Sequence, residues 1–170
     1  MRDDDRVLDE LVAARGTALK HYATLLAGDA DAADDLLQEA LIRALARSRV
    51  IRVDEVEGYV RRTLLHLVID AGRRRQRWRR RLPTVIDGPN VQPDSSPAIC
   101  DRVSITAAIG TLPVRQRACI VLHYYEDLGL GEVAHRLGCS VGTVKSQLHD
   151  ARSSLAQMLS DDLRPDSQGV

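Results

Sequence analysis

The stretch that decides the fold lies at residues 128–152 and reads Leu-Gly-Leu-Gly-Glu-Val-Ala-His-Arg-Leu-Gly-Cys-Ser-Val-Gly-Thr-Val-Lys-Ser-Gln-Leu-His-Asp-Ala-Arg. Its first part predicts a short helix in which the small side chain of Ala134 lets a second helix approach. Gly138 stands where the chain has to take a left-handed conformation in order to turn. Ser140 is placed to cap the helix that follows. Because turn, cap and apolar spacing agree, the stretch predicts a helix-turn-helix rather than a plain helical hairpin.

The second helix of this motif carries hydrogen-bonding side chains on its outward face. Val144 and Leu148 have the spacing that holds this helix against the first one. The outward positions are Thr143, Lys145, Ser146 and His149. Side chains of this kind suit base edges and phosphates in a major groove, so these four are candidate DNA contacts. The motif alone does not distinguish one class of DNA-binding regulator from another.

The rest of the chain favours helices as well. Apolar residues make up 44% of the 170 residues and aromatic residues only 3%, with no Phe, so the core has to be built from Leu, Val, Ile and Ala. Apolar side chains recur at intervals of three and four over residues 7–27, 32–48 and 56–81, and Leu11 and Val12 are among those expected to face the core of the first of these helices. A turn with a helix cap is expected at residues 28–31.

A change of composition divides the chain. Four prolines between residues 82 and 101 exclude a continuous helix there. The sequence therefore predicts an all-α protein of two small helical domains joined by a flexible linker. The expected limits are residues 1–81 for the first domain, 82–101 for the linker, 102–160 for the second domain and 161–170 for a disordered tail.

The net charge of zero hides an uneven distribution. Residues 58–81 carry nine basic side chains and one acidic one, whereas the segments before and after are net acidic. Such an asymmetry indicates a polyanionic partner at one place and a different partner elsewhere. It also raises the hypothesis that acidic and basic faces partly mask each other when the protein is unbound.

Two surfaces stand out within the first domain. The basic run at residues 73–81 includes Trp78, and an aromatic ring among arginines is typical of contact with unstacked bases. A merely solubilising charge run is the alternative. Residues 31–45 form a helix with acidic and amide side chains on its exposed face, which favours binding to protein rather than DNA. The alternative there is a solvated helix face.

Several classes of protein are excluded. The three Cys residues, at positions 100, 119 and 139, are scattered and odd in number, which fits a reducing cytoplasm rather than a disulfide framework. The acidic start is unlike a signal peptide. No apolar run approaches the ~20 residues that a membrane-spanning helix needs. The sequence predicts a cytoplasmic protein without membrane insertion.

Catalytic and metal-binding motifs do not stand out either. Cys119 and His123 are four residues apart, as metal ligands can be, but no second pair has suitable spacing. A packed core pair is the expected role for these two. There is no glycine-rich phosphate loop and no nucleophile elbow. We therefore expect no metal, no cofactor and no enzymatic activity.

Three stretches carry a resemblance to a known family. Residues 112–117 and 121–128, followed by the helix-turn-helix up to Ser146, closely resemble region 4 of the extracytoplasmic-function (ECF) sigma factors of RNA polymerase. That region binds the −35 promoter element. Residues 31–45 resemble region 2.2, which docks on the clamp helices of the polymerase β′ subunit. Residues 59–64, with Asp70 and the arginines after it, resemble regions 2.3 and 2.4, which open and read the −10 element.

The resemblance implies a promoter-directing factor and assigns roles to particular residues. The resemblance covers roughly residues 6–81 and 102–159. The sequence of residues 59–64 is similar to that of the SigE-like group common in actinobacteria. The implied partners are core RNA polymerase (β′ clamp helices and β subunit), promoter DNA and, as a further candidate, an anti-sigma factor. The implied core-binding residues are Asp34, Asp35, Leu36, Gln38, Glu39 and Arg43. The implied −10 and melting residues are Tyr59, Arg62, His66, Arg73, Arg74, Arg77 and Trp78. The loop at residues 49–55 would complete a pocket for flipped bases.

This sequence departs from the family pattern at four positions. Leu41 and Leu45 stand where the family usually has aromatic residues, and we expect them to pack as core. His66 replaces a usual Asn. Asp150 stands where Arg is common, and a carboxylate facing phosphate would be repelled, so we expect it to point away or to accept a hydrogen bond from cytosine.

Two other interpretations make different predictions. A dimeric helix-turn-helix regulator with a helical sensor domain would bind a specific operator by itself. A helical adaptor that binds only proteins would leave both candidate DNA surfaces unused. A sigma factor binds DNA weakly alone and initiates at promoters once core polymerase is added.

Overall fold

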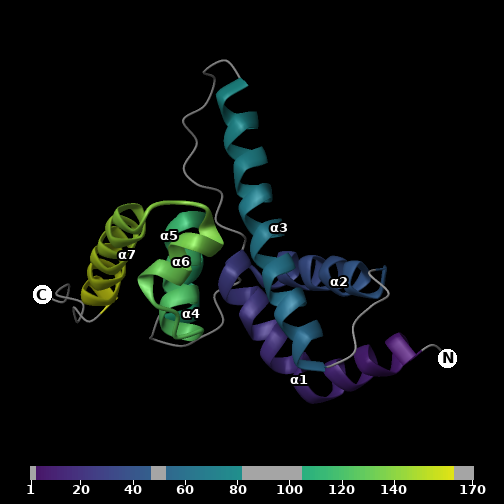
Figure 1. The fold of residues 1–170 in the computed structure, drawn as a ribbon. Coiled ribbons are helices and arrows are strands. Elements are labelled where there is room, and N and C mark those ends of the chain that lie inside the picture. Colours follow the sequence, from purple (N-terminus) through teal and green to yellow (C-terminus); the bar gives the residue numbers. More distant parts are fainter. Residues whose placement is uncertain (1–2, 47–52, 82–104, 163–170) are drawn as a thin grey trace, which may run out of the picture.

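The computed structural model describes residues 3–46, 53–81 and 105–162, and these residues form helices and turns only. The Pro-rich segment at residues 82–101 and most of the loop at residues 49–55 lie outside the described residues. The first helical unit consists of α1 (Asp3–Ala27), α2 (Ala30–Ala46) and α3 (Val53–Arg81), which pack against one another (Figure 1). The second unit follows residue 104.

Within residues 105–162 the second unit has four α-helices and one π-helical turn. They are α4 (Ile105–Thr111), α5 (Val114–Ile120), the π-helical turn η1 (Val121–Tyr125), α6 (Leu130–Leu137) and α7 (Val141–Asp162). Pro113 separates α4 from α5, as expected of a residue that lacks a backbone N–H. Within this unit α7 packs on both α5 and α6. The fold is therefore all-α with two helical domains, as predicted.

The turn between α1 and α2 is specified by two residues. Gly28 has a φ of +78°, which a glycine adopts without a steric penalty. The next residue, Asp29, accepts a hydrogen bond from the backbone N–H of Ala32 at 2.9 Å through its Oδ2 atom. This is the N-cap of α2, and it confirms the cap predicted at residues 28–31.

The core of the first unit is built mainly from aliphatic side chains, with Tyr22 at its centre, fully buried. Two expectations for this core are wrong. Val12 and Leu45 were expected to face inward, but they are 47% and 41% exposed. At the end of α2 the residue that faces the core is Ala44, and Leu45 beside it points outward. The buried residues of α2 are the small Ala33, Ala40 and Ala44, which let α2 lie close to its neighbours. Leu41 packs against the core as expected.

The helix-turn-helix is present as predicted. Helix α6 ends at Gly138, which has φ +60° and ψ +44°. Ser140 caps α7, since its Oγ atom accepts a hydrogen bond from the backbone N–H of Thr143 at 3.1 Å. Val133 and Val144 are fully buried where the two helices meet.

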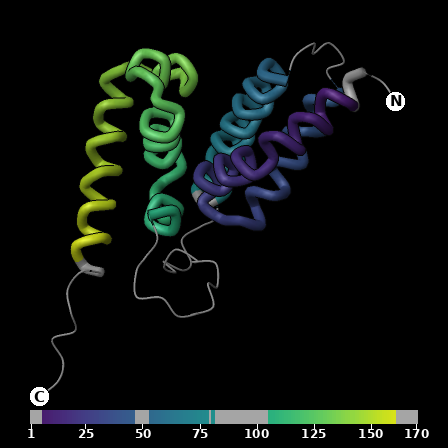
Figure 2. The backbone as a smooth tube through the Cα atoms, turned by 90° about the horizontal axis from the view of Figure 1, so that it is seen from below, coloured from purple at the N-terminus to yellow at the C-terminus, as the bar shows by residue number. Residues whose placement is uncertain are grey.

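The two helical units lie side by side, and α1 and α3 of the first contact α4, α5 and η1 of the second (Figure 2). At one point the backbones nearly touch. A methyl group added at Gly110 of α4 would lie 2.8 Å from the carbonyl oxygen of Gly28. The second half of α3 extends past the other helices (Figure 1). None of the described helices has the length and apolar character needed to cross a membrane.

Candidate nucleic-acid interface

The outward face of α7 is exposed to solvent. All four side chains assigned to the −35 contact are exposed: Thr143, Lys145, Ser146 and His149. Val144 and Leu148 are buried, so the opposite face of α7 points to solvent. Asp150 is exposed as well and follows Ser146 by four residues, so it lies on the same face. The helix therefore presents donors together with one carboxylate, as a reader of base edges can.

The arginine-rich end of α3 has the features of a nucleic-acid surface. Trp78 is 68% exposed, which is unusual for so large an apolar ring. Arg73, Arg74 and Arg77 are exposed around it. Arg73 lies 3.5 Å from the carboxylate of Asp70, which is the acidic residue of this segment. An exposed ring among cations can stack on bases while the guanidinium groups bind phosphates.

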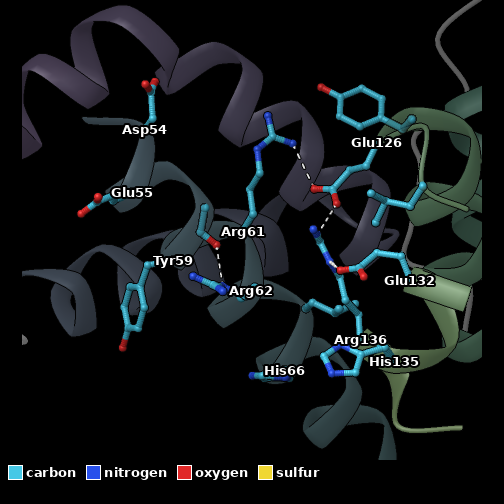
Figure 3. A pocket seen from close by; sticks show the side chains of 14 residues that line it. Asp54, Glu55, Tyr59, Arg61, Arg62, His66, Glu126, Glu132, His135 and Arg136 are labelled. Carbon is cyan, nitrogen blue, oxygen red and sulfur yellow. Dashed lines mark hydrogen bonds and ion pairs between the residues drawn. The ribbon is translucent and has the colours of Figure 1, made fainter. Parts of the chain in front are cut away.

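The first half of α3 lines a cleft between the two units. Tyr59, Arg62 and His66 lie along the α3 side of this cleft, and α6 lies on the opposite side (Figure 3). The cleft has a volume of about 1110 Å³. Arg62 and His66 are exposed, and Tyr59 is half-buried. The structure thus brings three of the seven predicted −10 and melting residues together on one helix face.

The acidic face of α2 points outward, away from the buried Ala33, Ala40 and Ala44. Of the six residues assigned to core polymerase, five are exposed, and these are Asp34, Asp35, Gln38, Glu39 and Arg43. Leu36 is half-buried against the core. Arg43 pairs with Glu39 at 2.7 Å, and Ile42 beside it is 52% exposed. An apolar side chain within a charged rim is a common composition for a protein-binding surface.

Arg117 is a buried cation that sequence reasoning missed. It is 6% exposed, and its guanidinium donates hydrogen bonds to four carbonyl oxygens. Two of them, Leu26 and Ala27 at 2.7 and 2.8 Å, end helix α1 of the other unit. Gly110 and Leu112 supply the other two, at 2.7 and 3.0 Å. Burial, with a smaller contribution from the charge of Arg75, lowers the pKa of Arg117 to about 10, so the side chain stays charged at neutral pH.

Glu126 is a second contact between the units, and it too was missed. Its carboxylate lies 3.4 Å from Arg61 of α3 and 2.7 Å from Arg136 of α6 (Figure 3). Arg61 lies over the ring of Tyr22, with the guanidinium carbon 4.8 Å from the ring centroid. Burial opposes the charge on Arg61, but hydrogen bonding to Glu57 and the charges of the two glutamates prevail, so its pKa is raised. Burial and then the charge of Glu126 raise the pKa of Tyr22.

Neither Arg117 nor Glu126 gives a local signal in the sequence. The partners of Arg117 in α1 are 90 and 91 residues away, and Arg61 is 65 residues from Glu126. One sequence feature points to Arg117: it directly precedes the apolar run at residues 118–122, which is buried in the structure. A cation at such a position is rarely buried unless it is paired.

Cys119 and His123 do not form a recognisable metal site. Cys119 is buried, and His123 Nδ1 lies 2.7 Å from the carbonyl oxygen of Leu128. Burial, followed by the influence of Cys139, raises the pKa of Cys119 to about 11. Across residues 3–46, 53–81 and 105–162 no group of three or more His, Cys, Asp or Glu residues could hold a metal ion.

Comparisons with known proteins agree with this geometry. Residues 11–79 match the family model of Sigma-70 region 2, and residues 102–155 match that of Sigma-70, region 4. A solved sigma factor, RpoE of Bartonella quintana in complex with the anti-sigma factor NepR, shares the fold with a TM-score of 0.54 at 24% identity. The similarity covers 92% of this chain and 98% of that one.

Curated proteins that are similar in sequence over most of this chain are also sigma factors. The RNA polymerase sigma-E factor of Streptomyces coelicolor is 33% identical over 156 residues, which cover 89% of this chain and 85% of that protein. The ECF RNA polymerase sigma factor EcfG of Rhodopseudomonas palustris is 32% identical over 173 residues, with 95% and 92% covered. The ECF RNA polymerase sigma factor SigL of Mycobacterium tuberculosis is 32% identical, with 84% and 83% covered. The chain therefore belongs to the ECF sigma factors, which direct RNA polymerase to promoters to initiate transcription.

Proposed function

We propose that this sigma factor opens promoter DNA with the α3 face that carries Tyr59, Arg62 and His66. The observation that supports this most strongly is the grouping of an aromatic ring, a guanidinium and an imidazole on one face of α3. Farther along the same helix, Trp78 and exposed arginines extend the basic surface. A flipped base can stack on the aromatic ring while the cations bind the phosphates of the strand that carries it.

Melting by this face needs no catalysis. Unstacking a base costs a few kcal/mol, and capture of the flipped base on protein offsets that cost. We propose that Arg73, Arg74, Arg77 and Trp78 hold the backbone and the upstream edge of the duplex. The factor itself then acts as a binding protein, without a catalytic residue, metal or cofactor, and works in the cytoplasm.

The other two surfaces complete the assignment. Exposed donors on α7 favour reading of the −35 element by Thr143, Lys145, Ser146 and His149. The rim of acids around Ile42 on α2 favours docking on the clamp helices of β′, with the β subunit as a further contact. We propose residues 1–81 and 102–160 as the working domains, 82–101 as the linker and 161–170 as a tail.

An anti-sigma factor is a proposed regulator of this chain. The support is the fold shared with a sigma factor that was solved in complex with an anti-sigma factor. A pull-down with tagged chain from the source cell, followed by identification of the retained proteins, tests this part of the proposal.

The melting face can be tested with permanganate, which modifies unpaired thymines. Holoenzyme is reconstituted from purified core polymerase, and promoter fragments are selected from genomic DNA with it. We expect Tyr59→Ala to abolish thymine reactivity near −10 while protection of the −35 element persists. Tyr124→Ala is the matched control, because Tyr124 is 56% exposed and lies outside this face. Normal opening by Tyr59→Ala, or equal loss in both variants, would overturn the assignment.

A further inference from the structure

Asp150 is an acidic side chain on the face of α7 that is proposed to read the −35 element. It is exposed, whereas Val144, Leu148 and Ala151 hold the opposite face of the helix in the core. A carboxylate beside DNA is repelled by the phosphates. This repulsion weakens binding unless a cation of the protein or a hydrogen-bond donor of the DNA offsets it.

The described part of the protein offers Asp150 no cation. None of the residues three and four positions away on the helix is basic, and these are Ser146, Gln147, Ser153 and Ser154. Among the described residues no ion pair joins the carboxylate of Asp150 to another side chain. Asp150 also lies beyond the first turn of α7, where the helix dipole stabilises an acid. Its charge is therefore left for a donor outside the chain.

Exposed side chains of α7 form two rows along the helix. The first row is basic and consists of Lys145, His149 and Arg152. The second row has two hydroxyls and the carboxylate and consists of Thr143, Ser146 and Asp150. Within each row the residues are three or four positions apart, so they lie on one line along the helix. Because the basic row suits the phosphates, the second row is the one that suits base edges.

The four bases differ in what they offer a carboxylate in the major groove. An ionised carboxylate only accepts hydrogen bonds. Cytosine presents the donor N4, and adenine presents the donor N6 beside the acceptor N7. Guanine presents the acceptors N7 and O6, and thymine presents the acceptor O4, so both repel a carboxylate. A carboxylate in this row therefore favours cytosine.

We propose that Asp150 selects a cytosine at one position of the −35 element and so sets the promoter preference of this chain at that position. The inference rests on the proposed reading of the −35 element by α7. Thr143 and Ser146 in the same row can donate as well as accept, so they do not impose this choice. A well-placed contact distinguishes the right base from a wrong one about tenfold.

Selection from a promoter fragment with a randomised −35 element tests this inference. Holoenzyme is reconstituted from the full chain and purified core polymerase, and the bound fragments are sequenced. For the wild type we expect cytosine at one position to be enriched about tenfold over guanine and thymine. Asp150→Ala should lose this enrichment and keep the preferences at the other positions. Asp150→Asn should shift the enrichment to adenine, because an amide pairs with both N6 and N7 of that base.

Gln157→Ala is the matched control. Gln157 is exposed on the same helix, farther toward its C-terminal end than the residues assigned to DNA. This variant should select the same sequences as the wild type. Circular dichroism verifies that all variants keep the same helix content, which we expect because both substituted positions are exposed.

The outcomes separate the role of Asp150 from the function on which it rests. Absence of cytosine enrichment in the wild type, or an unchanged preference in Asp150→Ala, overturns the inference. A uniform gain in affinity of Asp150→Ala for every sequence also overturns it, because the carboxylate then faces phosphates. If Lys145→Ala weakens binding in those cases, the −35 assignment of α7 stands. If neither Lys145→Ala nor the Asp150 variants change affinity or preference, that assignment fails as well.

Discussion

Replacement of Arg117 by Met should destabilise the folded chain strongly. Methionine keeps most of the apolar stem but leaves the carbonyls of Leu26, Ala27, Gly110 and Leu112 without their donor. Leaving a buried acceptor without its donor costs about 1–3 kcal/mol, a figure that already includes desolvation, and four acceptors are affected here.

Burial lowers the pKa of Arg117 to about 10, so the side chain is charged at neutral pH and its four hydrogen bonds come from a cation. Because the four contacts share one side chain and do not add fully, the loss expected for Arg117→Met is about 3 kcal/mol or more in the free energy of unfolding. Part of this loss belongs to the interface with α1 and part to the turn between α4 and α5, because two of the four oxygens lie on each side.

Equilibrium unfolding in urea measures this loss, with the helical circular dichroism signal as the probe. Arg115→Met is the control, because Arg115 is an exposed residue on the same helix and should change stability by less than about 0.5 kcal/mol. If Arg117→Met unfolded at the wild-type urea concentration, or if Arg115→Met lost as much, the structural role given to Arg117 would be refuted.

Three further predictions concern single side chains. Lys145→Ala should weaken binding of the holoenzyme to the −35 element about tenfold in a mobility-shift assay, while the amount of core polymerase retained in a pull-down stays unchanged. Equal loss of both would count against the −35 assignment. Asp35→Arg should weaken the complex with core polymerase about tenfold at unchanged thermal stability, because Asp35 is exposed, and undiminished binding would contradict the α2 assignment. At pH 8 iodoacetamide should modify Cys139 but not Cys119. The thiol of Cys119 has a pKa of about 11, so ~0.1% of it is thiolate at that pH. Mass spectrometry of peptides containing Cys119, before and after unfolding, measures its modification.

The helix-turn-helix could be predicted from the sequence because its signals are local. Gly138 supplies the left-handed turn and Ser140 the cap, both within a few residues of the helices that they separate. The turn at Asp29 is of the same kind. In each case one side chain and one nearby backbone group decide the conformation.

The contacts between the two units could not be predicted in this way. Within the part of the chain that the structure describes, Arg117 has no carboxylate partner. Its acceptors in α1 are backbone oxygens, which any sequence would offer. The hypothesis that acidic and basic faces partly mask each other agrees with the Glu126–Arg61 pair, which joins an acidic segment to the basic one. It does not account for Arg117, which binds backbone oxygens. Helical periodicity likewise left Val12 and Leu45 ambiguous, since each is adjacent to the true inward position. The functional residues stay predictions, but the structure places Tyr59, Arg62 and His66 on one face.

Run-off transcription with purified core polymerase tests the central claim most directly. The chain, the core enzyme and selected promoter fragments are combined, and each is also omitted in turn. The account predicts a transcript of defined start only when all three are present, with little specific binding of the chain to the same DNA by itself. Tight, sequence-specific binding by the chain alone, with no transcript and no complex with the core enzyme, would contradict it.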